Sequence, residues 1–304
     1  MSNAVTNIPA SIRRRLLNRA REEGKPFDEL LQRYAMERFL YRLSLSKYAD
    51  RLVLKGALMI SLWNAPVSRP TRDIDFLAEV ADDVETIKSI VKEICIQEIE
   101  PDGLEFDFES ITGQVIKESD EYPGVRVKFE GYIGEARVHM QLDFGFGDVV
   151  FPHATKVAYP TLLGMQQPIL LGYTQESVIA EKLESIARLE LINSRVKDFY
   201  DLWLLSRENA FEGKTLQRAM IETFNNRKRE LSTDLLEIIT EYSQMDRATE
   251  RWSILRRRAR LEYAPESFEN IAEGIREFAG PVIEAVEQGR PSPGKWDPAG
   301  PWHD

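Results

Sequence analysis

The chain contains few residues of the kinds that build disulfide or zinc frameworks. Among its 304 residues there are one cysteine, Cys95, and three histidines. A single cysteine allows no internal disulfide, which is typical of proteins of the reducing cytosol. His153 and His303 lie far from any cysteine or glutamate pair with the spacing of metal ligands, and His139 is expected to be a solvated strand residue. The sequence therefore does not favour a zinc site.

Long apolar stretches are absent as well. No run of about 18 apolar residues, the length that spans a bilayer, occurs in the sequence. The segment from Met1 to Pro9 lacks the charged and apolar regions of a signal peptide. We also find no Gly-x-Ser-x-Gly elbow, no Walker-type phosphate loop and no Rossmann glycine pattern. These absences predict a cytoplasmic protein without membrane contact, and they argue against hydrolase-triad and P-loop chemistry.

The net charge of −10 argues against a protein that coats nucleic acid by overall electrostatic attraction. The basic residues are nevertheless clustered near the N-terminus and in two later segments. Such clusters are usually solvated helix faces, yet a local positive patch on an acidic protein can steer a polyanion to one place. The candidate contacts are Arg13, Arg14, Arg227, Arg229 and Arg257.

The order of helical and strand-like patterns predicts an α+β fold with four regions. These are helices packed on the core in residues 1–50, an α+β core in residues 51–165, a helical C-terminal region in residues 166–288 and a flexible tail in residues 289–304. In the first region we expect Ser11 to cap a helix that runs through Arg21, with a break at Gly24-Lys25-Pro26. The four prolines of the tail indicate flexibility, with Trp296 and Trp302 resting on the surface.

The core region is expected to hold a mixed, mostly antiparallel sheet. Its elements are a helix at residues 83–97, strands near residues 104–108, 125–130 and 136–144, and a hairpin turn at residues 131–134. The last strand alternates apolar and polar residues. If its apolar residues face the core, the opposite face carries His139, Gln141 and Asp143. Asp143 is then a candidate carboxylate for a functional site, although a strand-end aspartate is more often a turn former.

Two aspartates follow an apolar run and a helix-like stretch. If residues 73–77 form a strand, the pleat turns Asp73 and Asp75 to one face while Ile74 enters the core. Mg²⁺ prefers oxygen ligands and commonly takes one or two carboxylates together with substrate phosphates. A metal site for a phosphate-bearing substrate is the first hypothesis, beside the alternative that this Asp-x-Asp is a solvated strand edge.

A lysine and an aspartate of the helical region form a second candidate group. Lys182 lies beside apolar neighbours on one expected helix, and Asp198 and Asp201 share a face of the next. If Lys182 points into a cleft, its ammonium is suited to neutralising a triphosphate, and Asp198 then orients Lys182 or Arg195. The alternative is a network of charged side chains at the surface.

Three separated stretches carry a family resemblance. They are Leu54-Lys55-Gly56 with Thr71-Arg72-Asp73-Ile74-Asp75-Phe76, then Gln141-Leu142-Asp143-Phe144-Gly145-Phe146-Gly147-Asp148, and then Ile179-Ala180-Glu181-Lys182 with Asn193-Ser194-Arg195-Val196-Lys197-Asp198-Phe199-Tyr200-Asp201-Leu202. In this order and spacing, between residues 9 and 207, they resemble the AbiEii/AbiGii toxin family of nucleotidyltransferases. That family belongs to the DNA polymerase β-like superfamily.

The resemblance implies a polymerase β-like nucleotidyltransferase core whose active site is completed by the C-terminal helices. It implies transfer of a nucleoside monophosphate from an NTP to an acceptor hydroxyl, with release of pyrophosphate. Asp73, Asp75 and Asp143 would hold Mg²⁺ or Mn²⁺. Lys182 matches the lysine that contacts the nucleotide phosphates, and Asp198 matches the catalytic acidic residue that follows it. The other residues implied in nucleotide binding are Lys55, Gly56, Thr71 and Arg72.

One position departs from the family pattern. The superfamily usually has a serine or threonine after the glycine, whereas this chain has Ala57 after Gly56, so a hydroxyl that assists the triphosphate is missing. Gly56 still allows the backbone to approach a phosphate at a helix N-terminus. Ser61 or Thr71 can replace the hydroxyl, and Thr71, two residues before Asp73, is also placed for self-modification.

Members of this family are regarded as toxins of toxin–antitoxin or phage-defence systems, and some act on tRNA. The resemblance therefore implies an RNA acceptor, tRNA first, with the five arginines named above as RNA-binding residues. It also implies an antitoxin encoded beside the chain. Two alternatives stay open: a nucleotidyltransferase that modifies a protein or a small molecule, and a non-catalytic nucleotide-binding interaction protein.

Overall fold

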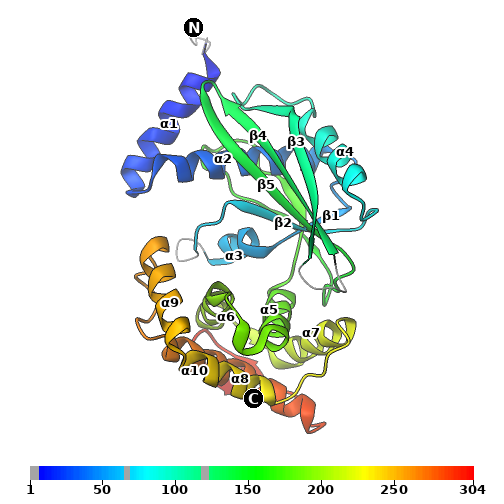
Figure 1. Ribbon diagram of the computed structural model, residues 1–304, viewed down its shortest axis with the longest axis vertical. Coiled ribbons are helices and arrows are strands. Elements are labelled where there is room, and N and C mark those ends of the chain that lie inside the picture. The colour runs from blue at the N-terminus through cyan, green and yellow to red at the C-terminus, as the bar shows by residue number, and fades with distance from the viewer. Residues whose placement is uncertain (1–6, 65–68, 118–122) are drawn as a thin grey trace. The chain divides into compact units, whose positions relative to one another are not determined.

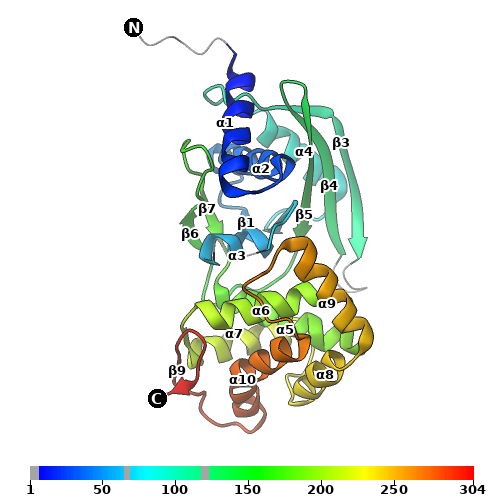
Figure 2. The same ribbon diagram turned by 90° about the vertical axis from the view of Figure 1, so that its left-hand side faces the viewer.

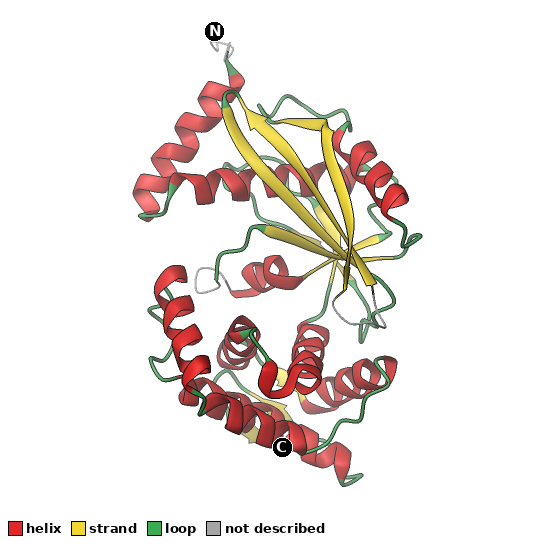
Figure 3. Cartoon of the chain, viewed as in Figure 1, coloured by secondary structure: helices red, strands yellow, loops and turns green. Residues whose placement is uncertain are grey.

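The computed structural model describes residues 7–64, 69–117 and 123–304. Within these ranges the chain divides into two compact units. Most strands belong to one unit and most helices to the other (Figure 3). The first unit comprises residues 1–58, 70–147 and 155–172, and the second comprises residues 59–69, 148–154 and 173–304. Two short segments of the second unit thus interrupt the first in sequence.

The described residues of the first unit form a seven-stranded sheet in the order β3-β4-β5-β2-β1-β7-β6. Strands β1 to β5 are labelled in Figure 1, and β6 and β7 in Figure 2. The strands are β1 (Leu52–Lys55), β2 (Asp73–Ala78), β3 (Glu105–Lys117), β4 (Pro123–Ile133), β5 (Ala136–Gly145), β6 (Thr155–Ala158) and β7 (Ile169–Gly172). Neighbouring strands are antiparallel except for β2 with β5 and β1 with β7. The predicted mixed, mostly antiparallel sheet of an α+β fold is confirmed.

Helices of the first unit pack against this sheet. They are α1 (Ile8–Glu23), α2 (Phe27–Leu45) and α4 (Val84–Cys95). The first residues of α3 (Gly56–Asn64) also belong to this unit. Phe39 of α2 contacts Phe106 of β3 and Phe129 of β4, with ring centroids 6.1 and 5.9 Å apart. Asp83 caps α4 by accepting a hydrogen bond from the backbone nitrogen of Thr86 at 2.8 Å. The core therefore lies between α2, α4 and one face of the sheet.

The first helix begins earlier than the sequence analysis predicted. Asn7, not Ser11, is the cap, and its side chain accepts a hydrogen bond from the backbone nitrogen of Ala10 at 3.0 Å. Pro9 falls in the first turn of the helix. Backbone N–H groups there have no partner within the helix, so the N–H that proline lacks is not needed. Ser11 therefore lies inside the helix. The helix ends at Glu23, two residues beyond the predicted Arg21, and the predicted break at Gly24 is confirmed by its position as the C-cap.

The hairpin between β4 and β5 is tighter than predicted. Pairing continues to Ile133 opposite Ala136, so the turn consists of Gly134 and Glu135 alone. Gly134 has a φ of +61°, which glycine adopts without strain. Gly131 was predicted in the turn but belongs to β4.

The second unit is mainly helical (Figure 2). Its helices are α5 (Gln175–Leu189), the short 3₁₀ helix η1 (Glu190–Ile192), α6 (Val196–Glu208), α7 (Gly213–Asn226), α8 (Asp234–Ser243), α9 (Asp246–Ala259) and α10 (Phe268–Glu287). Aromatic side chains fill its core: the ring of Phe199 lies 5.1 Å from that of Tyr242 and 5.3 Å from that of Phe268. Over the described ranges, no helix combines the length and apolar composition needed to cross a bilayer.

The C-terminal tail packs on the second unit, although we expected it to be flexible. The short strands β8 (Phe211–Glu212), β9 (Lys295–Trp296) and β10 (Trp302–His303) form a small sheet. The indole nitrogen of Trp296 donates to the carbonyl of Ser206 at 2.7 Å, and that of Trp302 to the carbonyl of Phe278 at 2.8 Å. Burial of the Trp296 indole and the hydrogen bond from the half-buried Trp302 hold this proline-containing segment in place.

Candidate active site

Strand β2 presents two carboxylates on one face of the sheet. Asp73 and Asp75 are half-buried, whereas Ile74 between them is fully buried. The alternation expected for a strand is therefore present.

Strand β5 brings a third carboxylate to the same face. It runs parallel to β2 with Asp143 opposite Asp75 and Gln141 opposite Asp73. Adjacent strands lie about 4.8 Å apart, so opposed side chains on one face are direct neighbours. Along β5 the apolar residues 138, 140 and 142 are buried, which confirms the predicted orientation of Asp143. The structure thus gathers three aspartates from two separate sequence stretches.

Arg126 of β4 engages the carboxylate of Asp143. The two residues are opposite one another in the sheet, with Nε 2.7 Å from Oδ1 and Nη2 2.6 Å from Oδ2. Hydrogen bonding to Asp143 raises the pKa of Arg126; burial opposes this, and the charges of Asp143, Asp73 and Asp75 add to it. Sequence reasoning missed this arginine, although its place between the buried Val125 and Val127 indicates the open face.

The three carboxylates have the chemistry of a magnesium site but not its arrangement. Carboxylate oxygens are the ligands that Mg²⁺ prefers. Among the residues that the structure describes, however, no three acidic, histidine or cysteine side chains are grouped so that they could hold a metal ion. Both oxygens of Asp143 are bonded to Arg126 instead. Binding of one ion by all three aspartates therefore requires Asp143 to leave Arg126.

Gly56 makes room for Asp75. Lys55 stands opposite Asp75 in β1, and Gly56 follows at the start of α3 with a φ of +70°. A β-carbon at Gly56 would overlap the carboxylate of Asp75, and the positive φ disfavours other residues. The glycine predicted to let a phosphate approach is thus required by a carboxylate of the site itself.

Thr71 and Arg72 lie immediately before β2. The Oγ1 of Thr71 accepts from the backbone nitrogen of Asp73 at 3.4 Å. The side chain of Arg72 is exposed, and its carbonyl accepts from Nε2 of Gln32 at 3.4 Å. Their roles in nucleotide binding stay predictions.

Two aspartates of α6 hold Lys182 of α5. Its Nζ lies 2.7 Å from Oδ1 of Asp198 and 2.8 Å from Oδ2 of Asp201, and its side chain is 13% exposed. Burial lowers the pKa of Lys182, but the charges of the two aspartates outweigh it and leave the pKa raised. The expected contact between Asp198 and Lys182 is present.

Asp201 binds a second cation. Arg69 places Nε 3.0 Å from Oδ1 and Nη2 2.9 Å from Oδ2 of this fully buried aspartate. Burial raises the pKa of Asp201, yet the charges of Arg69 and Lys182 outweigh it and hold the pKa below its ordinary value. The spacing of Asp198 and Asp201 was a signal for Asp201, but nothing in the sequence indicated Arg69.

The sequence profile of one protein family matches residues 38–274, more than half of the chain. The family is described as the nucleotidyl transferase AbiEii toxin of a type IV toxin–antitoxin system. The chain belongs to this AbiEii family. The resemblance carried by the three sequence stretches is thereby confirmed, and with it the assignment of this chain as a nucleotidyltransferase.

Two solved structures are similar to this AbiEii family member. A proposed nucleotidyltransferase from H. pylori is 14% identical, with 86% of this chain and 97% of that chain covered and a TM-score of 0.50. JHP933 from Helicobacter pylori is also 14% identical, with 86% and 94% covered and a TM-score of 0.49. No curated protein matches the sequence. At such low identity the first likeness shows the nucleotidyltransferase fold alone.

The arginines predicted to bind RNA lie on several elements of this AbiEii chain. Arg13 and Arg14 belong to α1 and Arg257 to α9, whereas Arg227 and Arg229 follow α7. Arg227 is bonded to Asp148, and Nε of Arg229 lies 3.3 Å from Oε1 of Glu184. Arg14 and Arg257 are exposed. Arg227 and Arg229, in contrast, are engaged in the ion pairs with Asp148 and Glu184.

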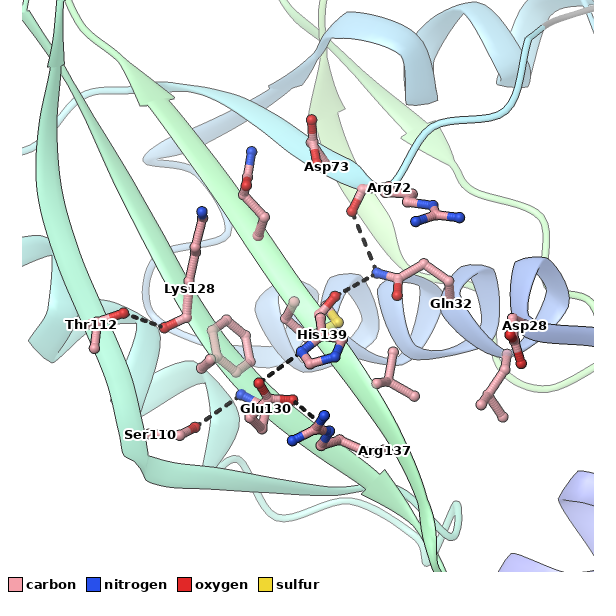
Figure 4. Close-up of a pocket in the computed structure, with 15 residues that line it drawn as sticks. Asp28, Gln32, Arg72, Asp73, Ser110, Thr112, Lys128, Glu130, Arg137 and His139 are labelled. Carbon is pink, nitrogen blue, oxygen red and sulfur yellow. Dashed lines mark hydrogen bonds and ion pairs between the residues drawn. The ribbon is translucent and has the colours of Figure 1, made fainter. Parts of the chain in front are cut away.

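A polar groove lies beside Asp73 in the first unit, and we call it the sheet groove (Figure 4). Its volume is about 700 Å³. Its lining residues are Asp28, Leu31, Gln32, Arg72, Asp73, Ser110, Thr112, Lys128, Phe129, Glu130, Arg137, Val138, His139, Met140 and Gln141. Gln32 of α2 closes one side, because its Nε2 donates to the carbonyl of His139 at 2.9 Å. The groove therefore opens on the sheet face that carries the aspartates.

Proposed function

We propose that this chain transfers a nucleoside monophosphate from an NTP to a hydroxyl group of RNA, with tRNA as the first acceptor. We propose further that it is the toxin of a toxin–antitoxin system that serves phage defence, and that an antitoxin encoded beside it opposes it. The observation that carries the proposal is the in-register placement of Asp75 and Asp143 on the face of Asp73. Membership of the AbiEii family supports it.

In the proposed reaction the acceptor oxygen attacks the α-phosphorus of the NTP and forms a new phosphorus–oxygen bond. The bond from the α-phosphorus to the oxygen that bridges to the β-phosphate breaks, and pyrophosphate leaves with the electron pair. Such transfers depend on positioning and charge neutralisation more than on covalent help from the protein. The hydroxyl proton passes to Asp143 after its release from Arg126.

Asp73, Asp75 and Asp143 are the proposed ligands of Mg²⁺ or Mn²⁺, which when bound neutralises charge on the phosphates. Lys55, Gly56, Thr71 and Arg72 are proposed to contact the nucleotide. Lys182, oriented by Asp198, is the proposed contact of its phosphates. An ammonium has three donors, and the described aspartates take two of them, so one can bond a phosphate oxygen.

The test is incubation of the chain with each α-labelled NTP, total RNA and Mg²⁺, followed by separation of RNA, protein and small molecules. We expect label in tRNA and its loss in Asp73→Asn. Asp107→Asn is the matched control, because Asp107 is also a half-buried aspartate of the same sheet, bonded on β3 to the backbone nitrogen of Glu109 at 3.1 Å.

Other outcomes separate the alternatives. Label in protein or in a small molecule indicates a different acceptor for the same chemistry. Toxicity that survives both Asp73→Asn and Lys182→Ala indicates a non-catalytic interaction protein. Absence of label in every fraction with every NTP contradicts the proposed function.

A further inference from the structure

We propose that the sheet groove binds the phosphodiester backbone of the RNA acceptor and that Lys128 is its principal phosphate contact. This inference rests on the proposed function, because it assigns the groove beside Asp73 to the second substrate of the same site. It concerns residues other than the arginines that the sequence pointed to.

The strand register places Lys128 in line with Asp73. Thr112, Lys128, Gln141 and Asp73 stand opposite one another across β3, β4, β5 and β2. With about 4.8 Å between neighbouring strands, Lys128 is two strands, or roughly 10 Å, from Asp73. Figure 4 shows Lys128 and Asp73 among the residues that line the groove. An RNA whose reacting hydroxyl lies at Asp73 therefore brings a neighbouring phosphate within reach of the Lys128 side chain.

The charges of the groove leave Lys128 available for an anion. Lys128 is exposed, and no acidic partner contacts its ammonium among the residues that the structure describes. Glu130, the acid nearest to it along β4, is already engaged: Nδ1 of His139 lies 2.7 Å and Nε of Arg137 3.9 Å from its carboxylate. An incoming phosphate therefore meets a cation without first breaking an ion pair.

The polarity of the lining favours a nucleic-acid backbone over a small apolar ligand. Small-molecule pockets are lined predominantly by apolar and aromatic side chains, whereas Phe129, Val138 and Met140 are only 2%, 3% and 1% exposed. The other lining groups include hydroxyls, amides and cations, together with the carboxylates of Asp28, Asp73 and Glu130. Hydroxyls, amides and cations are typical of protein–nucleic acid interfaces. Since Phe129 is buried and His139 carries the one exposed ring among the described lining residues, we expect mainly contacts to phosphate and sugar, with little dependence on base sequence.

The first experiment measures RNA binding without nucleotide. Fluorescently labelled tRNA is titrated with the full chain at several salt concentrations, and the slope of log affinity against log salt is determined. Loss of one phosphate contact lowers this slope by about one. We expect that change in Lys128→Ala but not in Lys156→Ala, a control on β6 of the same sheet that is 69% exposed and lies 3.8 Å from Asp50.

The second experiment distinguishes the RNA backbone from the triphosphate of the NTP. In the transfer assay Lys128→Ala should raise the KM for RNA and leave the KM for NTP unchanged, and the reverse result overturns the inference. Equal salt slopes for Lys128→Ala and wild type, or no RNA binding by wild type, overturn it as well. A third result separates the two proposals. If wild type binds tRNA and Lys128→Ala lowers the salt slope as predicted, but wild type transfers no label, the proposed function fails while the groove assignment stands.

Discussion

Arg126 holds Asp143 through both carboxylate oxygens, with nitrogen–oxygen distances of 2.7 and 2.6 Å. The pair lies on the face that also carries Asp73 and Asp75. A guanidinium forms two parallel bonds to a carboxylate, which an ammonium cannot reproduce. Arg126 therefore competes with any metal ion that needs Asp143 as a ligand.

Replacement of Arg126 by lysine keeps the charge and removes the two-point contact. We expect Arg126→Lys to bind Mn²⁺ about tenfold more tightly than wild type, because Asp143 is freed. This change corresponds to about 1.4 kcal/mol of binding free energy. Electron paramagnetic resonance titration without nucleotide measures this affinity. Lys128→Ala is the control, since it removes a nearby charge from the same strand but leaves the pair intact, and we expect a change below about threefold. Equal affinities of Arg126→Lys and wild type would rule out the competition.

Gly56→Ala tests how Asp75 is seated. An alanine there adopts a φ of +70° at a cost of about 1–2 kcal/mol, and its β-carbon displaces the carboxylate of Asp75. Because small displacements of a reacting group cost about 100-fold in rate, we expect at least that loss of nucleotidyl transfer in a folded variant. Gly24→Ala carries similar strain at a φ of +64° but has no atom within 4 Å of the added carbon. Equal transfer by the two variants would show that Gly56 does not position Asp75.

Asp201 supplies a pH-dependent part of the stability of the second unit. Asp201→Asn removes the charged partner of two cations whose side chains are 12% and 13% exposed. We expect the free energy of unfolding in urea at pH 7 to fall by about 3 kcal/mol. The folded-state pKa of Asp201 is lowered, so its contribution is present above the ordinary aspartate pKa of about 4 and is lost as the pH falls below it. The difference in free energy of unfolding between Asp201→Asn and wild type should therefore become smaller as the pH falls below about 4. Equal stability at pH 7 would contradict a structural role for the network.

The buried carboxyl group of Glu37 should give the stability of the first unit the opposite pH dependence. Its side chain is 1% exposed, and burial raises the pKa to about 7 against the hydrogen bond from the backbone nitrogen of Leu162 and the charge of Arg33. Stability is then full below the ordinary pKa and is lost as the pH rises through 7. By linkage we expect wild type to lose about 2–3 kcal/mol between pH 5 and pH 8 relative to Glu37→Gln. Parallel urea-unfolding stabilities of the two proteins over this range would sink the prediction.

The faces of the strands could be predicted from the sequence, but their register could not. Alternation along β5 assigns Asp143 to the open face, because the side-chain period of a strand is two. That Asp143 stands opposite Asp75 depends on pairing between strands far apart in the chain, which no local pattern encodes. The same limit applies to Arg69 and Asp201, which are 132 residues apart.

For the C-terminal tail, residues 289–304, amino-acid composition predicted flexibility, whereas the structure shows a packed segment. Its prolines are typical of a flexible segment, and flexibility was the prediction from the sequence. Tertiary packing outweighs it: Trp296 is 2% exposed, and the ring of Trp302 stacks 5.8 Å from that of Phe278. A large aromatic surface removed from water offsets the conformational entropy of a short segment.

The most direct test of the central claim is transfer of α-labelled nucleotide to RNA by wild type, Asp143→Asn and Asp107→Asn, measured side by side with Mg²⁺. We predict that wild type and Asp107→Asn label RNA alike. Asp143→Asn should lose about 100-fold or more, since the charge at the reacting centre is removed. Labelling by Asp143→Asn at the wild-type rate would contradict the assignment of the three aspartates as the site of nucleotidyl transfer.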